Sequence, residues 1–468
     1  MFRFSVNPTV EKLRVEQKEF IYQKMNWGPW QTPRNLFLAL VGELGELSDD
    51  VASNEQYTIH ENENSDKVKS GQLETATDSV AVEKVLSELA DVFSYLICLA
   101  QECQVNIAIP DSQRKDEPTS SFSEISWNEI EVTAFYQTVR ISEKTGIIRD
   151  FLSICFSASR VADHFQWIII EKGLKNLPKN KQEIIDKYIK ELFCQVVIFA
   201  SKYEYDLPKF LKEKNTLIAE KYCLSVGKLT KDDVITCRYS HLPSFHLTMS
   251  GNHSTKNDES YQLDKSVKNL KLSIDQLLCK LMKSVGLVAE SFQWKTDGAE
   301  AVITKSMHAH MCNQLSTITN LIQTLAQLHN ISLAESFNKK MNKNRDKYPL
   351  SDSKGTFIKY NEKEVNMKND DSHLNYKYPS VNTLADATTA MQLFVDERDW
   401  NKYHKNPRNL TIALFGEIGE VIELFVEKRK SDFTDCLGDE LSDCLAYTVR
   451  LVKCCDIDLS AAMVHYFP

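Results

Sequence analysis

The sequence predicts an all-α protein built from tandem helical units. The chain of 468 residues contains only 14 Gly and 12 Pro, a composition that favours long helices joined by few turns. Its apolar residues recur with helical spacing, and acidic residues interrupt these apolar runs at fixed intervals. Related motifs reappear along the chain with a repeat of roughly 100 residues, which is typical of tandem copies of one fold.

Two copies of an acidic pattern lie far apart in the chain. Each copy contains two acidic-x-x-acidic motifs in separate apolar runs, and residues three apart share one face of a helix. Two such helices facing each other would repel strongly in an apolar setting, and a hard cation such as Mg²⁺ relieves that repulsion. The predicted metal ligands are Glu43, Glu46, Glu88 and Asp91 in the first copy, and Glu417, Glu420, Glu440 and Asp443 in the second.

A solvated helix face is the usual role of a single acidic-x-x-acidic motif. Here a matched second motif and a second complete copy favour a metal site instead. An iron-binding carboxylate bundle requires Glu-x-x-His pairs, and the sequence contains none.

The residues around the acidic motifs recur as well. Thr32-Pro33 and Asn406-Pro407 each place a capping residue before a proline, which predicts a helix start ahead of both copies. A tryptophan precedes each start, and a tyrosine follows each second motif on the same helix face. Core packing is the alternative for the tryptophans. The aromatic residues expected to hold a base are Trp27, Tyr95, Trp400 and Tyr447.

The middle of the chain carries two weaker copies without the acidic set. The corresponding positions there are Ser157, Arg160, Glu191 and Cys194, then Ser284, Leu287, Gln314 and Thr317. The predicted units are 1–112 and 379–468 with complete acidic sets (the outer units), and 125–245 and 262–362 without them (the inner units). A polar insert at about 54–80 is expected to form a loop inside the first unit.

With these motifs assembled, the chain resembles the all-α nucleoside triphosphate pyrophosphatases, in particular the MazG-like dCTP pyrophosphatase group. The resemblance rests on PRNLFLALVGELGEL (33–47), LSELADVFSYL (86–96), PRNLTIALFGEIGEV (407–421) and GDELSDCLAYTV (438–449). It implies a four-helix core in each unit, Mg²⁺ held by the four carboxylates, and hydrolysis of a deoxynucleoside triphosphate to the monophosphate and pyrophosphate. It also implies tetramers whose sites draw on neighbouring subunits.

Two further features of that group survive only in the inner units. One is a Phe-Gln-Trp segment, which ends at Trp167 and Trp294; the other is a basic segment, of which a weaker version ends in 238–243. A solvated face is the alternative for the basic segment. The inner-unit residues that the resemblance implies for substrate binding are Trp167, Trp294, Lys340, Asn344, Lys347 and Tyr348.

Composition limits the remaining partners. The net charge of −9, without a basic stripe, argues against a nucleic-acid partner. No apolar run is long enough to span a membrane, and the N-terminal residues show no signal-peptide core, so we expect a cytoplasmic protein.

The sequence therefore predicts a single-chain pseudo-tetramer, alone or as a dimer, that hydrolyses dCTP or a related pyrimidine nucleotide with Mg²⁺. Glu46 or Glu420 is expected to accept the proton of the attacking water. The outer units keep the acidic sets, and the inner units keep the Phe-Gln-Trp and basic segments. We therefore expect two composite sites, each joining one outer unit to one inner unit. The alternative is a non-catalytic nucleotide-binding or scaffold protein derived from the same group.

Overall fold

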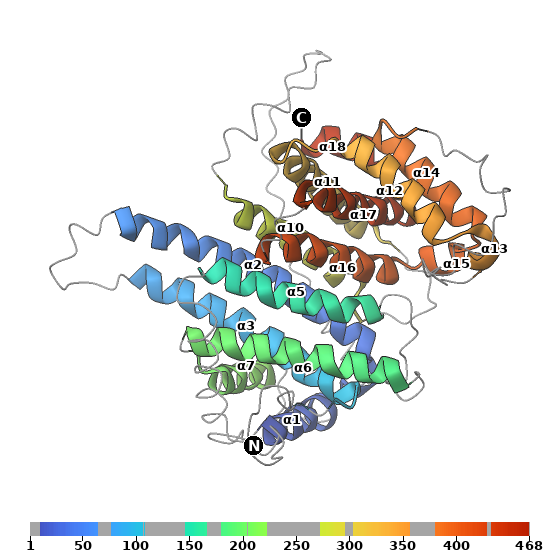
Figure 1. Ribbon diagram of the computed structural model, residues 1–468. Helices are drawn as coiled ribbons and strands as arrows, with labels where there is room; N and C mark the ends of the chain where they lie inside the picture. The colour runs from blue at the N-terminus through green and yellow to red at the C-terminus, as the bar shows by residue number, and fades with distance from the viewer. Residues whose placement is uncertain are drawn as a thin grey trace, which may run out of the picture.

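A computed structural model describes residues 10–63, 76–105, 107, 146–165, 179–203, 205–221, 272–294, 303–355, 380–427 and 432–467. Every regular element within these ranges is a helix, which confirms the predicted all-α class (Figure 1). No helix in the described ranges is both long and apolar enough to cross a membrane.

The first two groups of helices come from the N-terminal half of the chain. Those of the first outer unit are α1 (Val10–Lys18), the short turns η1 (Glu19–Lys24) and η2 (Gly28–Trp30), α2 (Pro33–Glu63) and α3 (Ala76–Glu102). Those of the first inner unit are α5 (Ile147–Phe165), α6 (Lys179–Lys202) and α7 (Leu207–Lys221). The insert expected at about 54–80 is shorter than predicted, because α2 continues to Glu63 and α3 begins at Ala76.

The other two groups of helices come from the C-terminal half of the chain. The second inner unit provides α10 (Ile274–Phe292), α11 (Lys305–Leu328), α12 (Leu333–Lys347) and α13 (Leu350–Ser353). The second outer unit provides α14 (Leu384–Glu397), α15 (Asn401–His404), α16 (Pro407–Val426), α17 (Phe433–Cys454) and α18 (Leu459–Tyr466).

Both predicted helix starts are confirmed. The side chain of Thr32 accepts a hydrogen bond from the backbone N–H of Asn35 (3.2 Å), and that of Asn406 accepts one from Arg408 (3.0 Å). Each cap fixes the first turn of the helix that carries an acidic motif, α2 or α16, and therefore the rotation at which its carboxylates face the neighbouring helix.

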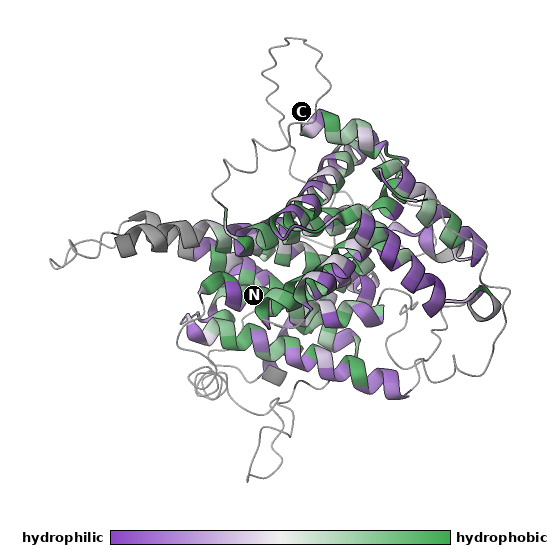
Figure 2. Cartoon of the chain, turned by 45° about the horizontal axis from the view of Figure 1, so that its top comes forward, coloured by the Kyte–Doolittle hydropathy of each residue, from purple (hydrophilic) through white to green (hydrophobic). Residues whose placement is uncertain are grey.

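Four helices from the four regions of the chain pack together at the centre of the molecule. The closest pairs are α2 with α10 and α5 with α16; α2 also packs on α5, and α10 on α16 (Figure 1). The ring of Phe37 on α2 lies 5.3 Å from that of Phe165 on α5 and 5.9 Å from that of Phe415 on α16. Apolar residues concentrate where the helices meet in the middle of the molecule (Figure 2). These contacts bind the four regions into one core.

Glycines within the acidic motifs allow the closest of these approaches. A Cβ atom at Gly45 would lie 2.8 Å from the Cα atom of Gly286 on α10. A Cβ atom at Gly419 would lie 1.9 Å from the side chain of Ser159 on α5. Since both glycines stand between the two glutamates of a motif, each motif is pressed against a helix from an inner unit.

Candidate active site

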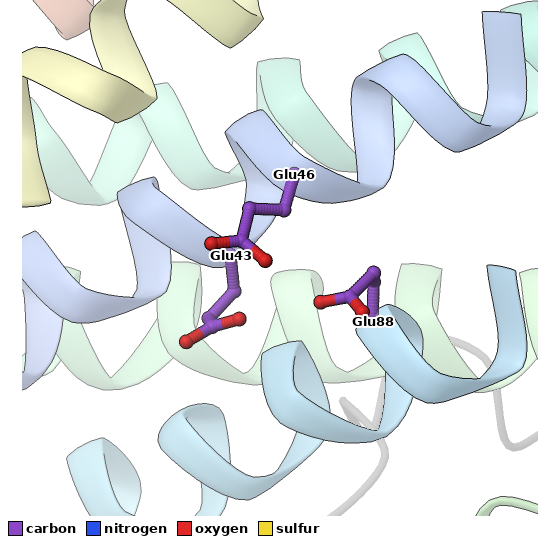
Figure 3. Close-up of side chains that lie close together, drawn as sticks. All are labelled: Glu43, Glu46 and Glu88. Atoms are coloured by element: carbon purple, nitrogen blue, oxygen red, sulfur yellow. The ribbon is translucent and has the colours of Figure 1, made fainter. Parts of the chain in front are cut away.

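Three carboxylates converge between α2 and α3. Glu43 and Glu46 on α2 and Glu88 on α3 each offer an oxygen atom, and these atoms all lie within 4.8 Å of one another (Figure 3). Asp91 lies one turn beyond Glu88 on α3. We refer to these four residues as the first cluster. The structure thus brings three of the four predicted ligands of the first copy together, and the charge of the fourth, Asp91, helps to raise the pKa of Glu43.

A second cluster lies between α16 and α17. Oxygen atoms of Glu417, Glu440 and Asp443 lie within 4.8 Å of one another. Glu420 belongs to the same group, since it hydrogen-bonds to Glu440. These four residues form the second cluster. The two clusters match in sequence position, but Glu46 belongs to the converging oxygens of the first and Asp443 to those of the second.

Burial and mutual repulsion shift the acidity of both clusters. Burial, reinforced by neighbouring carboxylates, raises the pKa of Glu43 and that of Glu417 well above the usual range. Burial also raises the pKa of Glu88 to about 7 and that of Glu440 to about 8, against the opposing effect of a nearby lysine. A nearby cation would stabilise the ionised form of these buried carboxylates and lower their pKa values.

A lysine from an inner unit reaches each cluster. Lys340 on α12 places its Nζ atom 2.5 Å from Asp443, with only 16% of its side chain exposed. Lys214 on α7 pairs with Asp91 and also donates to the Ser87 hydroxyl (2.9 Å). Although burial opposes the charged form, Asp443 and Asp91 raise the pKa values of the two lysines, so both remain cationic at neutral pH.

Sequence reasoning named Lys340 but missed Lys214. A detectable signal was present: when Leu207 of α7 is aligned with Leu333 of α12, Lys214 falls on Lys340. The weaker basic tail that was predicted at 238–243 lies outside the described residues.

The rest of the predicted basic segment also lies near the second cluster. Lys347 lowers the pKa of Asp443 by its charge, against the larger effect of burial. The pKa of Tyr348 is raised to about 12 by burial and by Asp443 and Glu417. The backbone carbonyl of Asn344 accepts from Tyr348 where α12 ends, and no contact of the Asn344 side chain with a cluster is seen in the described residues.

The aromatic residues of the second copy form a buried stack. The ring of His404 lies parallel to those of Trp400 (6.2 Å) and Tyr447 (6.5 Å). Trp400 is only 4% exposed, and its indole N–H donates to the carbonyl of Ser353 (2.9 Å). In this structure the ring of Trp400 packs as a core aromatic, and its role in base stacking stays a prediction. Tyr447 adjoins the carboxylates, because Glu417 and Asp443 add to the effect of burial in raising its pKa.

At the first cluster an aromatic contact comes from the second inner unit. Trp294, which follows α10 with a left-handed backbone (φ +59°), lies 5.9 Å from the ring of Tyr95 on α3. Trp27 is half-buried against the core beside η2. Trp167 lies outside the described residues.

These positions differ from the expected pairing of one outer unit with one inner unit. The first cluster receives Lys214 from the first inner unit and the Tyr95–Trp294 contact from the second. The basic contact follows adjacency in the chain, whereas the aromatic contact follows the packing of α2 on α10. The reason is geometric: α7 and α10 lie against different sides of the α2–α3 pair.

The raised pKa values predict how stability depends on pH in the absence of metal. Because the folded protein holds protons on Glu88 and Glu440 that the unfolded chain has released, the free energy of unfolding should fall as pH rises from about 5 to about 8. Urea denaturation in the presence of EDTA measures this slope. The Glu88→Gln/Glu440→Gln variant should show a shallower slope, and an unchanged slope would contradict the assignment.

Comparison with known proteins gives an independent result. Over 98 residues, 19% of the chain, the sequence is 37% identical to dCTP pyrophosphatase 1 of Mus musculus. Over 91 residues it is 40% identical to dCTP pyrophosphatase 1 of Homo sapiens. The chain spans about half the length of these relatives, 57% and 53% respectively. No family model matches the chain, and no solved structure matches it significantly. The matches support a relationship to the dCTP pyrophosphatases over about a fifth of the chain.

Proposed function

We propose that the protein is a Mg²⁺-dependent nucleoside triphosphate pyrophosphatase that converts dCTP, or a related pyrimidine deoxynucleotide, to the monophosphate and pyrophosphate. The observation that carries this proposal is the recurrence of one arrangement twice: four carboxylates on two helices, with a lysine from another unit at the aspartate. The partial identity to dCTP pyrophosphatases supports the substrate class.

The residues present fit a divalent cation. All ligands are carboxylate oxygens, which suit Mg²⁺. One of them, the Oε2 atom of Glu440, is buried and has no hydrogen-bond partner, which is costly for a carboxylate in this setting. The residues that would hold the ion are Glu43, Glu46, Glu88 and Asp91 in the first cluster, and Glu417, Glu420, Glu440 and Asp443 in the second. A bound Mg²⁺ would offset negative charge on the phosphates and acidify a water molecule.

The side chains around each cluster have separate tasks in the proposed reaction. Lys340, held at Asp443, would bind phosphate oxygens with its remaining N–H groups. Lys214 donates to Asp91 and to both the carbonyl and the hydroxyl of Ser87, so it would hold Asp91 in place and offset negative charge at the first cluster. Glu46, which is exposed in the first cluster, would take a proton from the attacking water, and Glu420 would do so in the second. The water oxygen bonds to the α-phosphorus, and the bond from that phosphorus to the bridging oxygen breaks to release pyrophosphate.

The reaction products test the proposal. Purified protein with Mg²⁺ should release pyrophosphate, rather than orthophosphate, from dCTP, and EDTA should stop the release. Ion-exchange chromatography of the products, alongside a pyrophosphate-specific coupled assay, distinguishes the two outcomes. Tight binding of dCTP without any product would instead support the non-catalytic scaffold.

The assembly remains part of this proposal. The four groups of helices share one core. The proposed arrangement is a pseudo-tetramer folded from one chain, with units at 1–112, 125–245, 262–362 and 379–468. Light scattering of the purified protein would give its mass in solution and separate a monomer from a dimer.

A further inference from the structure

A fifth carboxylate lies beside the first cluster and belongs to neither of its acidic motifs. Glu290 is on α10, one turn after Gly286, the residue that touches Gly45. Residues four apart share a helix face, so Glu290 faces α2 at the next turn. It meets Gly42 there, because a Cβ atom on Gly42 would lie 2.9 Å from the Cγ atom of Glu290. Gly42 immediately precedes Glu43.

The surroundings of Glu290 leave its charge unmatched. Its Oε1 atom is buried and has no hydrogen-bond partner. Burial raises the pKa of Glu290 to about 8, and the charged groups that add to this rise are Glu46 and Glu88, both in the first cluster. A buried carboxylate oxygen without a donor, exposed to the negative charge of two other carboxylates, is unfavourable unless a cation lies nearby.

We propose that Glu290 is an additional oxygen ligand of the cation bound at the first cluster, so that this site joins α2, α3 and α10. The proposal rests on the proposed function, since it adds a ligand to the same metal site. It also gives Gly42 a role: the absence of a side chain there admits the Glu290 carboxylate. A unit that has lost its own acidic set would in this way contribute directly to its neighbour's site.

The proposal is confined to the first cluster. The matching residue of α5 is Asp163, whose Oδ1 atom would lie 3.0 Å from a Cβ atom on Gly416. Asp163 is one methylene shorter than Glu290, and because it is exposed, water can solvate its charge without a cation.

Metal binding can be measured without reference to turnover. The parent for the test is full-length protein with Glu417→Gln and Glu440→Gln, which leaves the first cluster as the binding site. Electron paramagnetic resonance of free Mn²⁺, with Mg²⁺ as competitor, gives the dissociation constant. Adding Glu290→Gln should raise this constant by about 10- to 100-fold. In EDTA at about pH 9, above the pKa of Glu290, the same variant should unfold at a higher temperature than the parent, because a repelling charge has been removed.

Two further variants control for indirect effects. Gly42→Ala should weaken Mn²⁺ binding while leaving Glu290 in the chain, because the new methyl group displaces its carboxylate. Asp49→Asn also removes a negative charge from α2, but Asp49 is exposed and pairs with Lys283, so the Mn²⁺ constant should not change. If Glu290→Gln binds Mn²⁺ as tightly as the parent, Glu290 is not a ligand. If the parent binds no Mn²⁺, the metal of the proposed function falls as well.

Discussion

Replacing Glu43 and Glu417 together with glutamine should reduce dCTP hydrolysis by about a thousandfold or more, because several kcal/mol of metal-dependent stabilisation is removed from both sites. The pKa values of these two residues lie well above the usual range, with burial as the main cause. Glutamine keeps the shape of the side chain and removes its charge. Circular dichroism should therefore show unchanged helix content, and a pyrophosphate assay with saturating Mg²⁺ measures the loss.

The single variants separate the two clusters. Glu43→Gln alone should leave the activity of the second cluster, and Glu417→Gln alone that of the first. Asp49→Asn is the matched control, since it removes an exposed carboxylate of α2 outside the cluster. Near wild-type hydrolysis by the double variant would show that the carboxylates have been assigned the wrong role.

The local part of this site was predictable from the sequence. The spacing of Glu43 and Glu46 fixes a shared helix face, and Thr32-Pro33 fixes where that helix begins; neither depends on distant parts of the chain. The all-α class followed from the same kind of pattern. The structure has both features: Thr32 caps α2, and Glu43 and Glu46 point to the same site.

The contacts between units were less predictable. Lys214 and Glu290 reach the first cluster because α7 and α10 pack against different sides of α2 and α3, which no local pattern specifies. The surroundings of Trp400 were not predictable either. Its place ahead of a recurring helix start gives no sign that its indole N–H donates to the carbonyl of Ser353 and that its ring packs in the core.

The first inner unit shows how a carboxylate can be kept without a metal. Glu191 is the one acidic residue that remains of its set, and Arg160 donates to it at 2.9 Å. The guanidinium also lies over the ring of Tyr188, 4.3 Å from its centre. A fixed side-chain cation thus neutralises the carboxylate at this position, and α5 and α6 stay packed. Loss of the metal set in an inner unit therefore need not destabilise the core that supports the outer sites.

The two inner-unit lysines should each serve one cluster, which gives the second large effect. Removing Lys214 or Lys340 deletes a charged hydrogen bond worth about 1.5–3 kcal/mol, or roughly 10- to 100-fold in kcat/KM at its own site. In a Glu417→Gln background, where only the first cluster works, Lys214→Ala should cause this loss and Lys340→Ala should not. In a Glu43→Gln background the order should reverse. Steady-state kinetics with dCTP measures both.

Lys343→Ala is the matched control for Lys340→Ala. Lys343 lies on the same helix three residues later and pairs with Asp439, but 48% of its side chain is exposed, against 16% for Lys340. Its ion pair is screened by water and lies outside the carboxylate cluster, so kcat/KM should stay within about twofold of the parent. Equal losses from Lys343→Ala and Lys340→Ala would point to a general effect of the basic face. A loss from Lys340→Ala in both backgrounds would show that the two sites are coupled, contrary to the arrangement inferred from the contacts of α7 and α12.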